Sequence, residues 1–323
     1  MTKDNKGMQR IGDLIRASDV LPEIVNRKGI QPFTPIQVRL LAPMDAPEDV
    51  KEILYQHSVL CQTCMPYRDP GTERICARRN GIVRMEIQAG RALDPVTDDF
   101  VDVGLPWGPK ARLVLYHLNA EALKQKTRLI EVEDSLTAFV RRTLELDPKG
   151  RNIRSVKDQL ARLSAADFRL GANEGGRAVT IKSTIIDGFE LWAPRDPNQK
   201  VLWPTVIQFS QAYFDSLMEH AVPLNEQAVM RLSHNAMALD IYTWLAQRLH
   251  RIDPKRAAFV PWVSLKDQFG QGYHRMDNFK RVFRKTLAQV AVVYSEARYS
   301  MDGRGMRLLQ SRPPVLPRAF RIK

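Results

Sequence analysis

Apolar residues in the second half of the chain recur at intervals of three and four positions, the spacing of one buried face of an α-helix. Between two such stretches lie runs that favour β-strands, separated by the hairpin-like residues 172–176. The pattern predicts, in order, helices over 107–124, 136–146 and 151–164 and strands over 167–170 and 177–186. We therefore expect three helices and then a hairpin.

The same order returns after residue 205. Short helical stretches precede a long helix, an extended piece, a short helix that begins near Ser264, a glycine-containing turn, another long helix and a second hairpin around 302–305. The predicted elements are helices over 210–220, 225–232, 234–252 and 275–292 and extended segments over 260–263, 293–299 and 306–311. A short helix, a turn, a longer helix and a hairpin together predict a winged helix-turn-helix motif.

Proline and polar residues divide the chain between the two copies, and 193–200 is typical of a linker. We expect an α+β protein that is mainly helical, with two tandem winged helix-turn-helix domains after a smaller N-terminal α/β region. The expected divisions are an N-terminal region of unclear fold at 1–100, a first winged-helix domain at 105–192, a linker at 193–204, a second, strongly basic winged-helix domain at 205–315 and a basic tail at 316–323.

Charge changes the picture most in the last quarter of the chain. The 323 residues hold 49 Lys and Arg and 36 Asp and Glu, a formal net charge of +13. Residues 1–100 carry equal numbers of both signs, whereas residues 251–323 contain 16 basic and 5 acidic residues. A segment this basic is typical of proteins that bind a polyanion such as nucleic acid or anionic lipid. A merely soluble basic surface is the alternative.

The helix predicted over 275–292 combines an apolar stripe with a basic outer face. An α-helix fits the major groove of B-DNA, and Asn and Arg can each read a base edge through two hydrogen bonds. We expect Arg275, Asn278 and Arg281 to contact bases. The remaining cations, which we expect at phosphates, are Lys280, Arg284 and Lys285. An ordinary solvated helix face would explain the same residues.

Two other groups of cations extend this prediction. In the second hairpin, Arg304 and Arg307 are placed to follow the DNA backbone or the minor groove, although glycine beside arginine also makes an ordinary turn. In the first copy, the helix over 151–164 exposes Arg151, Arg154 and Lys157 beside acidic residues. This copy either contacts DNA more weakly or packs against another subunit in a homodimer, and the sequence leaves both open.

A cluster of sulfur and imidazole ligands lies near the N-terminal region. His57, Cys61, Cys64 and Cys76 have types that zinc prefers, but only one Cys-x2-Cys pair is present. Asp45 and Pro47 are typical of a helix start, and that helix would place His57 on its apolar face. A buried histidine with buried thiols therefore explains the cluster better than a metal, and we expect no metal and no cofactor.

Catalytic motifs are missing from the sequence. It contains no G-x-x-x-x-G-K-[ST] phosphate loop, no G-x-G-x-x-G after a strand, no H-E-x-x-H and no His-x-His pair. We therefore expect a protein that is not an enzyme. No apolar run approaches the roughly 20 residues that cross a bilayer, and the N-terminus is polar. A cytoplasmic protein without a membrane partner is the expectation.

Three blocks of the sequence resemble the plasmid-encoded RepA replication initiators. They are Leu60-Cys61-Gln62-Thr63 with Pro66-Tyr67-Arg68, Leu105-Pro106-Trp107-Gly108-Pro109-Lys110-Ala111-Arg112-Leu113, and Ala238-Leu239-Asp240-Ile241-Tyr242-Thr243-Trp244-Leu245-Ala246 with Arg248 and Phe269-Gly270. The resemblance runs from about residue 55 to 315, and residues 1–50 match nothing of this kind.

The resemblance implies a theta-type plasmid replication initiator. Such a protein binds double-stranded DNA at repeated origin sites (iterons), promotes opening of the duplex and recruits host replication proteins such as the helicase and the chromosomal initiator. Initiators of this kind often repress their own promoters as well. Two other hypotheses are a winged-helix transcriptional repressor without a role in replication, and a metal- or thiol-dependent enzyme built around residues 57–76.

Overall fold

In the computed structural model, the described part of the chain begins at residue 53, and several predicted segments fall outside it. The described residues are 53–94, 97–132, 151–174, 177–182, 184–192 and 203–315. The start of the N-terminal region, the helix predicted over 136–146 and the tail at 316–323 lie outside the described residues.

The prediction that His57 lies on a helix is wrong, because residues 53–57 form a strand. β1 (Ile53–His57) pairs antiparallel with β11 (Ala221–Asn225), so the described chain begins beside a segment more than 160 residues away. Leu54 and Gln56 alternate into the interior. Leu54 and His57 are buried in the strand as they would be on the predicted helical face, and the pairing with β11 rather than the local pattern decides between the two structures.

Four antiparallel strands form the largest sheet, in the order β2-β3-β7-β8. Their bounds are β2 Ile75–Asn80, β3 Val83–Gln88, β7 Asp167–Glu174 and β8 Arg177–Lys182. Alternate residues from three of these strands, including Cys76, Met85 and Phe168, are buried in the core. β4 (Arg91–Asp94) and β5 (Asp99–Asp102) form a separate hairpin. The hairpin β7–β8 therefore extends a sheet that begins in the N-terminal region.

β7 and β8, predicted as the hairpin of the first winged-helix domain, belong to the four-stranded sheet, and three other strands form a separate sheet. α4 (Gly108–Gln125) and α6 (Arg151–Ala165) pack together, and β6 (Leu129–Glu131) joins a three-stranded sheet of order β6-β10-β9. Its other members are β9 (Ile186–Trp192) and β10 (Trp203–Phe209), which pair antiparallel. Most of the linker predicted at 193–204 lies outside the described residues; the strands on either side of it, β9 and β10, pair with each other, and β10 begins within the predicted span.

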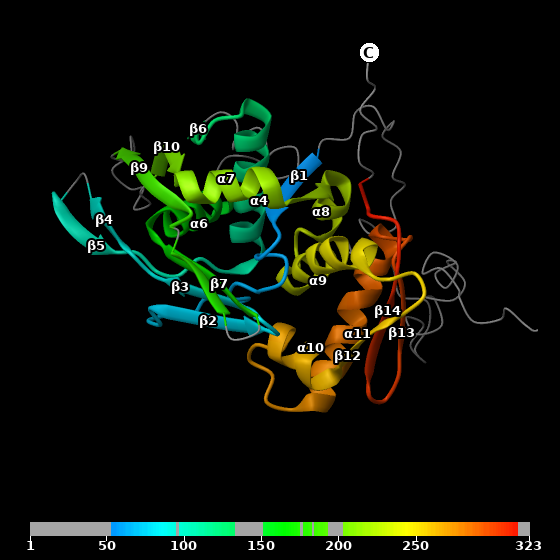
Figure 1. Ribbon diagram of the computed structural model, residues 1–323. Coiled ribbons are helices and arrows are strands. Elements are labelled where there is room, and N and C mark those ends of the chain that lie inside the picture. The colour runs from blue at the N-terminus through cyan, green and yellow to red at the C-terminus, as the bar shows by residue number, and fades with distance from the viewer. Residues whose placement is uncertain are drawn as a thin grey trace, which may run out of the picture.

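A single long helix lies at the centre of the molecule. After α7 (Gln211–His220) and α8 (Glu226–Leu232), α9 (Ala236–Arg248) is buried on all sides until its last turn and continues into a short 3-10 helix, η2 (Leu249–Arg251). It contacts both α4 and α11, which lie on different sides of it (Figure 1). The helix predicted over 234–252 is confirmed with slightly shorter bounds.

The C-terminal elements follow the predicted order closely. β12 (Ala258–Pro261) leads directly into α10 (Trp262–Phe269), a tight turn follows, and α11 (Met276–Val293) precedes the hairpin of β13 (Arg298–Met301) and β14 (Gly305–Leu309). The three strands form one antiparallel sheet with β14 in the middle. Gly272 has a φ of 74° in the turn between the two helices, a conformation that glycine adopts without strain.

One hydrophobic core runs through both halves of the described chain, from Leu54 to Leu308. The α+β class is confirmed. The expectation of a mainly helical protein is too strong, because the described residues hold fourteen strands in five small sheets beside seven α-helices. Strand content was underestimated mainly in the N-terminal region, where the sheet partners are distant in sequence.

Candidate nucleic-acid interface

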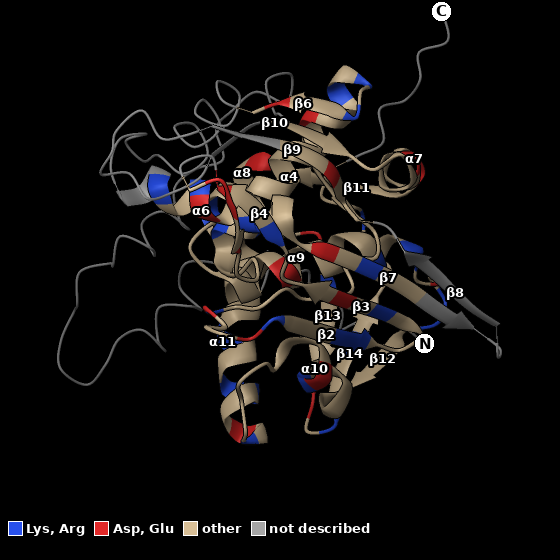
Figure 2. Cartoon of the chain, turned by 90° about the vertical axis from the view of Figure 1, so that its left-hand side faces the viewer, with Lys and Arg blue, Asp and Glu red and all other residues tan. Residues whose placement is uncertain are grey.

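The helix α11 separates an apolar face from a basic one. Phe279, Phe283 and Leu287 are fully buried against α9 and α10, at the spacing that the sequence predicts. The opposite face exposes most of the predicted cations. Its exposed polar residues are Arg275, Asp277, Asn278, Arg281, Arg284 and Lys285. Figure 2 shows basic segments along α11 and an acidic one at its N-terminal tip.

Residues at the start of α11 are joined to one another. Arg275 donates from Nε and Nη2 to the carboxylate of Asp277, at 3.0 and 2.7 Å. The hydrogen bond from Arg275 lowers the pKa of Asp277 below its ordinary value. Arg281 donates from Nη2 to Oδ1 of Asn278 at 2.7 Å. Both pairs are solvent-exposed, so DNA can replace their partners at little cost.

Trp262 connects the helix to the hairpin and orients two cations. Its indole N–H donates to the carbonyl oxygen of Asp302 at 3.0 Å, and its backbone N–H donates to the carbonyl of Arg304. Lys280 Nζ and Arg284 Cζ lie 5.3 and 5.2 Å from the centre of its ring. A cation held on a ring keeps its charge without a carboxylate partner, which suits contact with phosphate. No local pattern in the sequence indicates this role of Trp262.

The tip of the hairpin β13–β14 is a turn closed by Asp302. Its Oδ1 accepts from the backbone N–H groups of Arg304 and Gly305, at 2.8 and 3.0 Å, and these bonds lower the pKa of Asp302. Arg304 is exposed at the tip. Arg307 is also exposed, reaches Asp302 at 3.3 Å and lies over the ring of Phe259. Lys280 donates to the carbonyl of Gly303, so the tip is tied to α11.

The predicted cations of the first copy lie on a different unit. Arg154 on α6 is exposed and Lys157 is half-buried, whereas nothing is described of the side chain of Arg151. α6 packs against α4, β9 and β10, while α11 packs against α8, α9 and α10. The structure therefore gathers the cations of α11 and its hairpin, and it does not bring those of α6 to the same surface.

The histidine and cysteine residues do not form a metal site. His57 accepts from the N–H of Val59 through Nδ1 and donates from Nε2 to Oγ of Ser216 at 2.9 Å, so both ring nitrogens are used. Burial raises the pKa of the Cys61, Cys64 and Cys76 thiols. Among the described residues, no three His, Cys, Asp or Glu side chains are grouped as metal ligands would be.

A buried ion pair joins the three sequence blocks that carry the family resemblance. Arg112 on α4 donates to both carboxylate oxygens of Asp240 on α9, at 2.6 and 2.7 Å. Its other N–H groups donate to the carbonyls of Met65, Pro66 and Gly108. All five donors of the guanidinium are therefore satisfied, which a buried arginine requires. Both residues stand in the sequence blocks that carry the resemblance, but nothing in the sequence indicates that they pair.

No helix among the described residues combines the length and the apolar character needed to span a bilayer.

Part of the chain matches a known protein family by sequence. Residues 105–264 match the family described as "Plasmid encoded RepA protein". The resemblance predicted from the sequence blocks is confirmed over these residues. No curated protein matches the chain.

Among solved structures, a crystal structure of selenomethionine derivatives of domains 2 and 3 of RctB is 8% identical with a TM-score of 0.49, covering 78% of this chain and 95% of that one. A second crystal structure of RctB domains 2–3 is 9% identical with a TM-score of 0.47, covering 77% and 94%.

Proposed function

We propose, for a chain whose residues 105–264 belong to the plasmid-encoded RepA family, the role of a plasmid replication initiator. In this proposal the protein binds repeated duplex sites in the plasmid origin, promotes opening of the duplex, recruits host replication proteins and represses its own promoter. It acts in the cytoplasm and has no catalytic site of its own.

The observation that carries the proposal is the arrangement of residues 236–309. A helix, a strand, two helices joined by a tight turn, and a hairpin follow one another, and the first strand pairs with the second strand of the hairpin. We infer that this unit is a winged helix, with α11 as the recognition helix and β13–β14 as the wing. Its exposed cations lie on the helix face that points away from the core.

Different residues of the unit have different parts in this proposal. Arg281 lies on the outer face of α11 and reads a base edge in the major groove, with its present partner Asn278 displaced. Lys280 and Arg284, held on Trp262, face the phosphates between helix and wing. Arg304 at the wing tip follows the backbone or the minor groove.

The order of elements in the first half of the chain supports a second winged-helix unit. α4, β6, α6, β9 and β10 follow the order of a winged helix, and the three strands again place the last one in the middle. In this proposal β9–β10 is the wing, and the hairpin β7–β8 is an insertion that joins the N-terminal sheet. The ion pair between Arg112 and Asp240 links α4 with α9 and fixes the two units relative to each other.

Binding to the plasmid's own repeats tests the proposal. The full chain and duplexes carrying either the origin repeats or a scrambled sequence are compared by fluorescence anisotropy at several salt concentrations. We expect tighter binding to the repeats and a steep loss of affinity as salt increases, because each neutralised phosphate adds about 0.9 to the slope of log affinity against log salt. Equal affinity for both duplexes would contradict sequence-specific origin binding.

Two substitutions and a control separate base contacts from phosphate contacts. Lys285→Gln is expected to lower the affinity for both duplexes by the same factor and to lower the salt slope by about 1. Arg281→Ala is expected to lower the affinity for the repeats far more than for the scrambled duplex. Lys124→Gln removes a cation at the exposed end of α4 and serves as the control, with unchanged binding.

A winged-helix repressor without a replication role is the second candidate function, since the same fold and charge serve it. A plasmid that carries only the origin distinguishes the two when the protein is supplied in trans. Replication that depends on the protein supports the initiator. Replication without the protein, or none with it, supports the repressor.

A further inference from the structure

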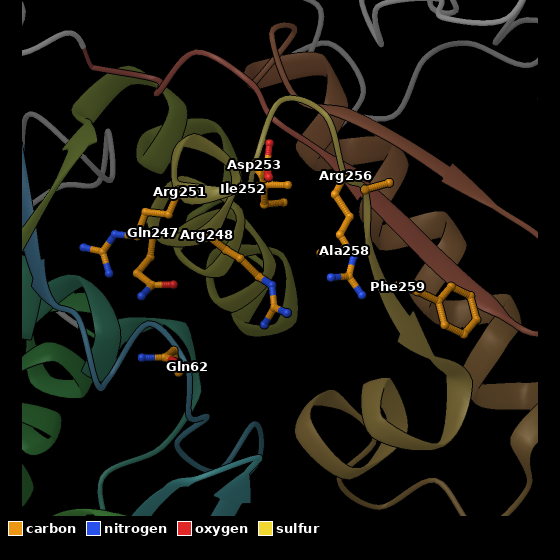
Figure 3. Close-up of a pocket in the computed structure, with 10 residues that line it drawn as sticks. Gln62, Gln247, Arg248, Arg251, Ile252, Asp253, Arg256, Ala258 and Phe259 are labelled. Atoms are coloured by element: carbon orange, nitrogen blue, oxygen red, sulfur yellow. The ribbon is translucent and has the colours of Figure 1, made fainter. Parts of the chain in front are cut away.

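A second group of arginines surrounds a pocket on another side of the C-terminal unit. The pocket lies between the C-terminal end of α9 and the loop that leads into β12, and it has a volume of about 690 Å³ (Figure 3). Gln62 and Gln247 lie at one end and Phe259 at the other. None of the residues proposed above to contact DNA lines it. We call it the α9–β12 pocket.

Two of its arginines face each other across open space. In Figure 3 the guanidinium groups of Arg248 and Arg256 both point into the space between α9 and the β12 loop. Arg248 lies over the ring of Trp244, with its Cζ 5.8 Å from the ring centre, and burial lowers its pKa. Within the described part of the chain, neither guanidinium has a hydrogen bond or ion pair with a carboxylate.

One acidic residue at the pocket offsets part of this charge, but among the described residues it forms no ion pair with an arginine. Asp253 lines the pocket, but its Oδ1 accepts from the backbone N–H of Lys255 at 2.8 Å, and no ion pair joins it to an arginine among the described residues. Arg251 adds a third cation at the same end of α9, where its Nε lies 3.4 Å from the ring of His250. Three arginines and one aspartate therefore line the pocket, which gives it a net charge of +2.

The end of helix α9 explains only part of this arrangement. Cations in the last turn of a helix interact favourably with its dipole, which accounts for Arg248 and Arg251. Arg256 lies outside any helix, and its guanidinium nevertheless points into the same space as that of Arg248. The guanidinium groups of Arg248 and Arg256 repel each other, and an anion bound between them would attract both.

We propose that the α9–β12 pocket binds a phosphate group between Arg248 and Arg256. Guanidinium groups match the oxygens of phosphate with paired hydrogen bonds, and the nearby side chain of Gln247 offers a further donor. The phosphate comes either from a DNA strand that extends beyond the surface of α11 or from a small phosphate compound. Only the first source rests on the proposed function.

Inorganic pyrophosphate is the probe that tests the site without DNA. Isothermal titration of the full chain is expected to show binding that is weakened at least tenfold by Arg256→Gln and by Arg248→Gln. Lys124→Gln removes one positive charge elsewhere and is expected to bind like the unchanged protein. Arg256 is exposed, so its substitution leaves the fold intact and keeps the test valid if the Arg248 variant unfolds.

The source of the phosphate is decided with DNA. If it is a DNA strand, Arg256→Gln lowers the salt slope of origin binding by about 1 and pyrophosphate competes with DNA. If it is a small compound, the variant loses pyrophosphate binding and keeps the salt slope. Absence of pyrophosphate binding together with an unchanged slope would overturn the site. Arginine-dependent pyrophosphate binding by a protein that ignores origin repeats would keep the site and refute the proposed function.

Discussion

Single residues hold the two halves of the molecule together, and Asp240 is the clearest case. Asp240→Asn leaves Arg112, which is 1% exposed, as a buried charge without a counterion. We expect a loss of about 3–5 kcal/mol in the free energy of unfolding, measured by urea denaturation. Glu86→Gln is the matched control, because its partner Arg169 and Glu86 itself are both more than a third exposed, and its cost should stay below about 1 kcal/mol. Similar losses for the two variants would contradict this role.

His57 makes the stability of the protein depend on pH. Burial, helped by His220, lowers the pKa of His57 from 6.5 to about 4. Between these values the unfolded chain binds a proton that the folded protein excludes, so the free energy of unfolding decreases as the pH falls. We expect His57 to contribute about 2 kcal/mol to the difference between pH 7.5 and pH 5. His57→Gln should reduce that difference in urea titrations, and an unchanged difference would contradict this explanation.

Some features of single residues could be predicted from the sequence alone, and others could not. The outward cations of α11 could be predicted because the helical period fixes which side chains share a face. The environment of His57 could not, because its strand partner lies more than 160 residues away. The pairing of Arg112 with Asp240 and the position of Arg248 opposite Arg256 likewise depend on tertiary contacts that no local pattern specifies.

At the scale of elements, the hairpin β13–β14 depends on close contact between β14 and β12. A Cβ atom on Gly305 would collide with the backbone carbonyl oxygen of Val260 on β12, whereas one on Gly303 would meet nothing within 4 Å. Gly305→Ala is therefore expected to cost about 1–3 kcal/mol of stability and to weaken DNA binding, while Gly303→Ala changes both little. Urea denaturation and anisotropy measure the two effects. Equal behaviour of the two variants would show that this contact is unimportant.

The elements of the C-terminal unit could be read from the sequence because each helix and turn is local. The first unit could be read only in part. The hairpin after α6 was predicted correctly as a hairpin, but its place in the N-terminal sheet was not predicted, because an isolated β-pattern does not tell which sheet it joins. The proline-rich residues 193–200 looked like a boundary between domains for the same reason, although β9 and β10 on either side pair with each other.

At the scale of the whole molecule, the charge distribution and the fold both support the proposed DNA-binding role. Much of the basic surplus of the last quarter lies on α11, on the hairpin β13–β14 and at the α9–β12 pocket, and the shared core keeps the two units in one body. Under the proposed function, this arrangement holds each protein in a fixed orientation on its DNA site.

Methylation interference on the plasmid's own origin tests the central claim most directly, because methylation of guanine N7 blocks contacts made in the major groove. The proposal predicts a small set of guanines in each repeat at which methylation prevents binding, and loss of part of that set in Arg281→Ala. Lys124→Gln should keep the full set. Interference spread evenly over the origin, or the same guanines in Arg281→Ala as in the unchanged protein, would contradict the assignment of α11 as the helix that reads the origin.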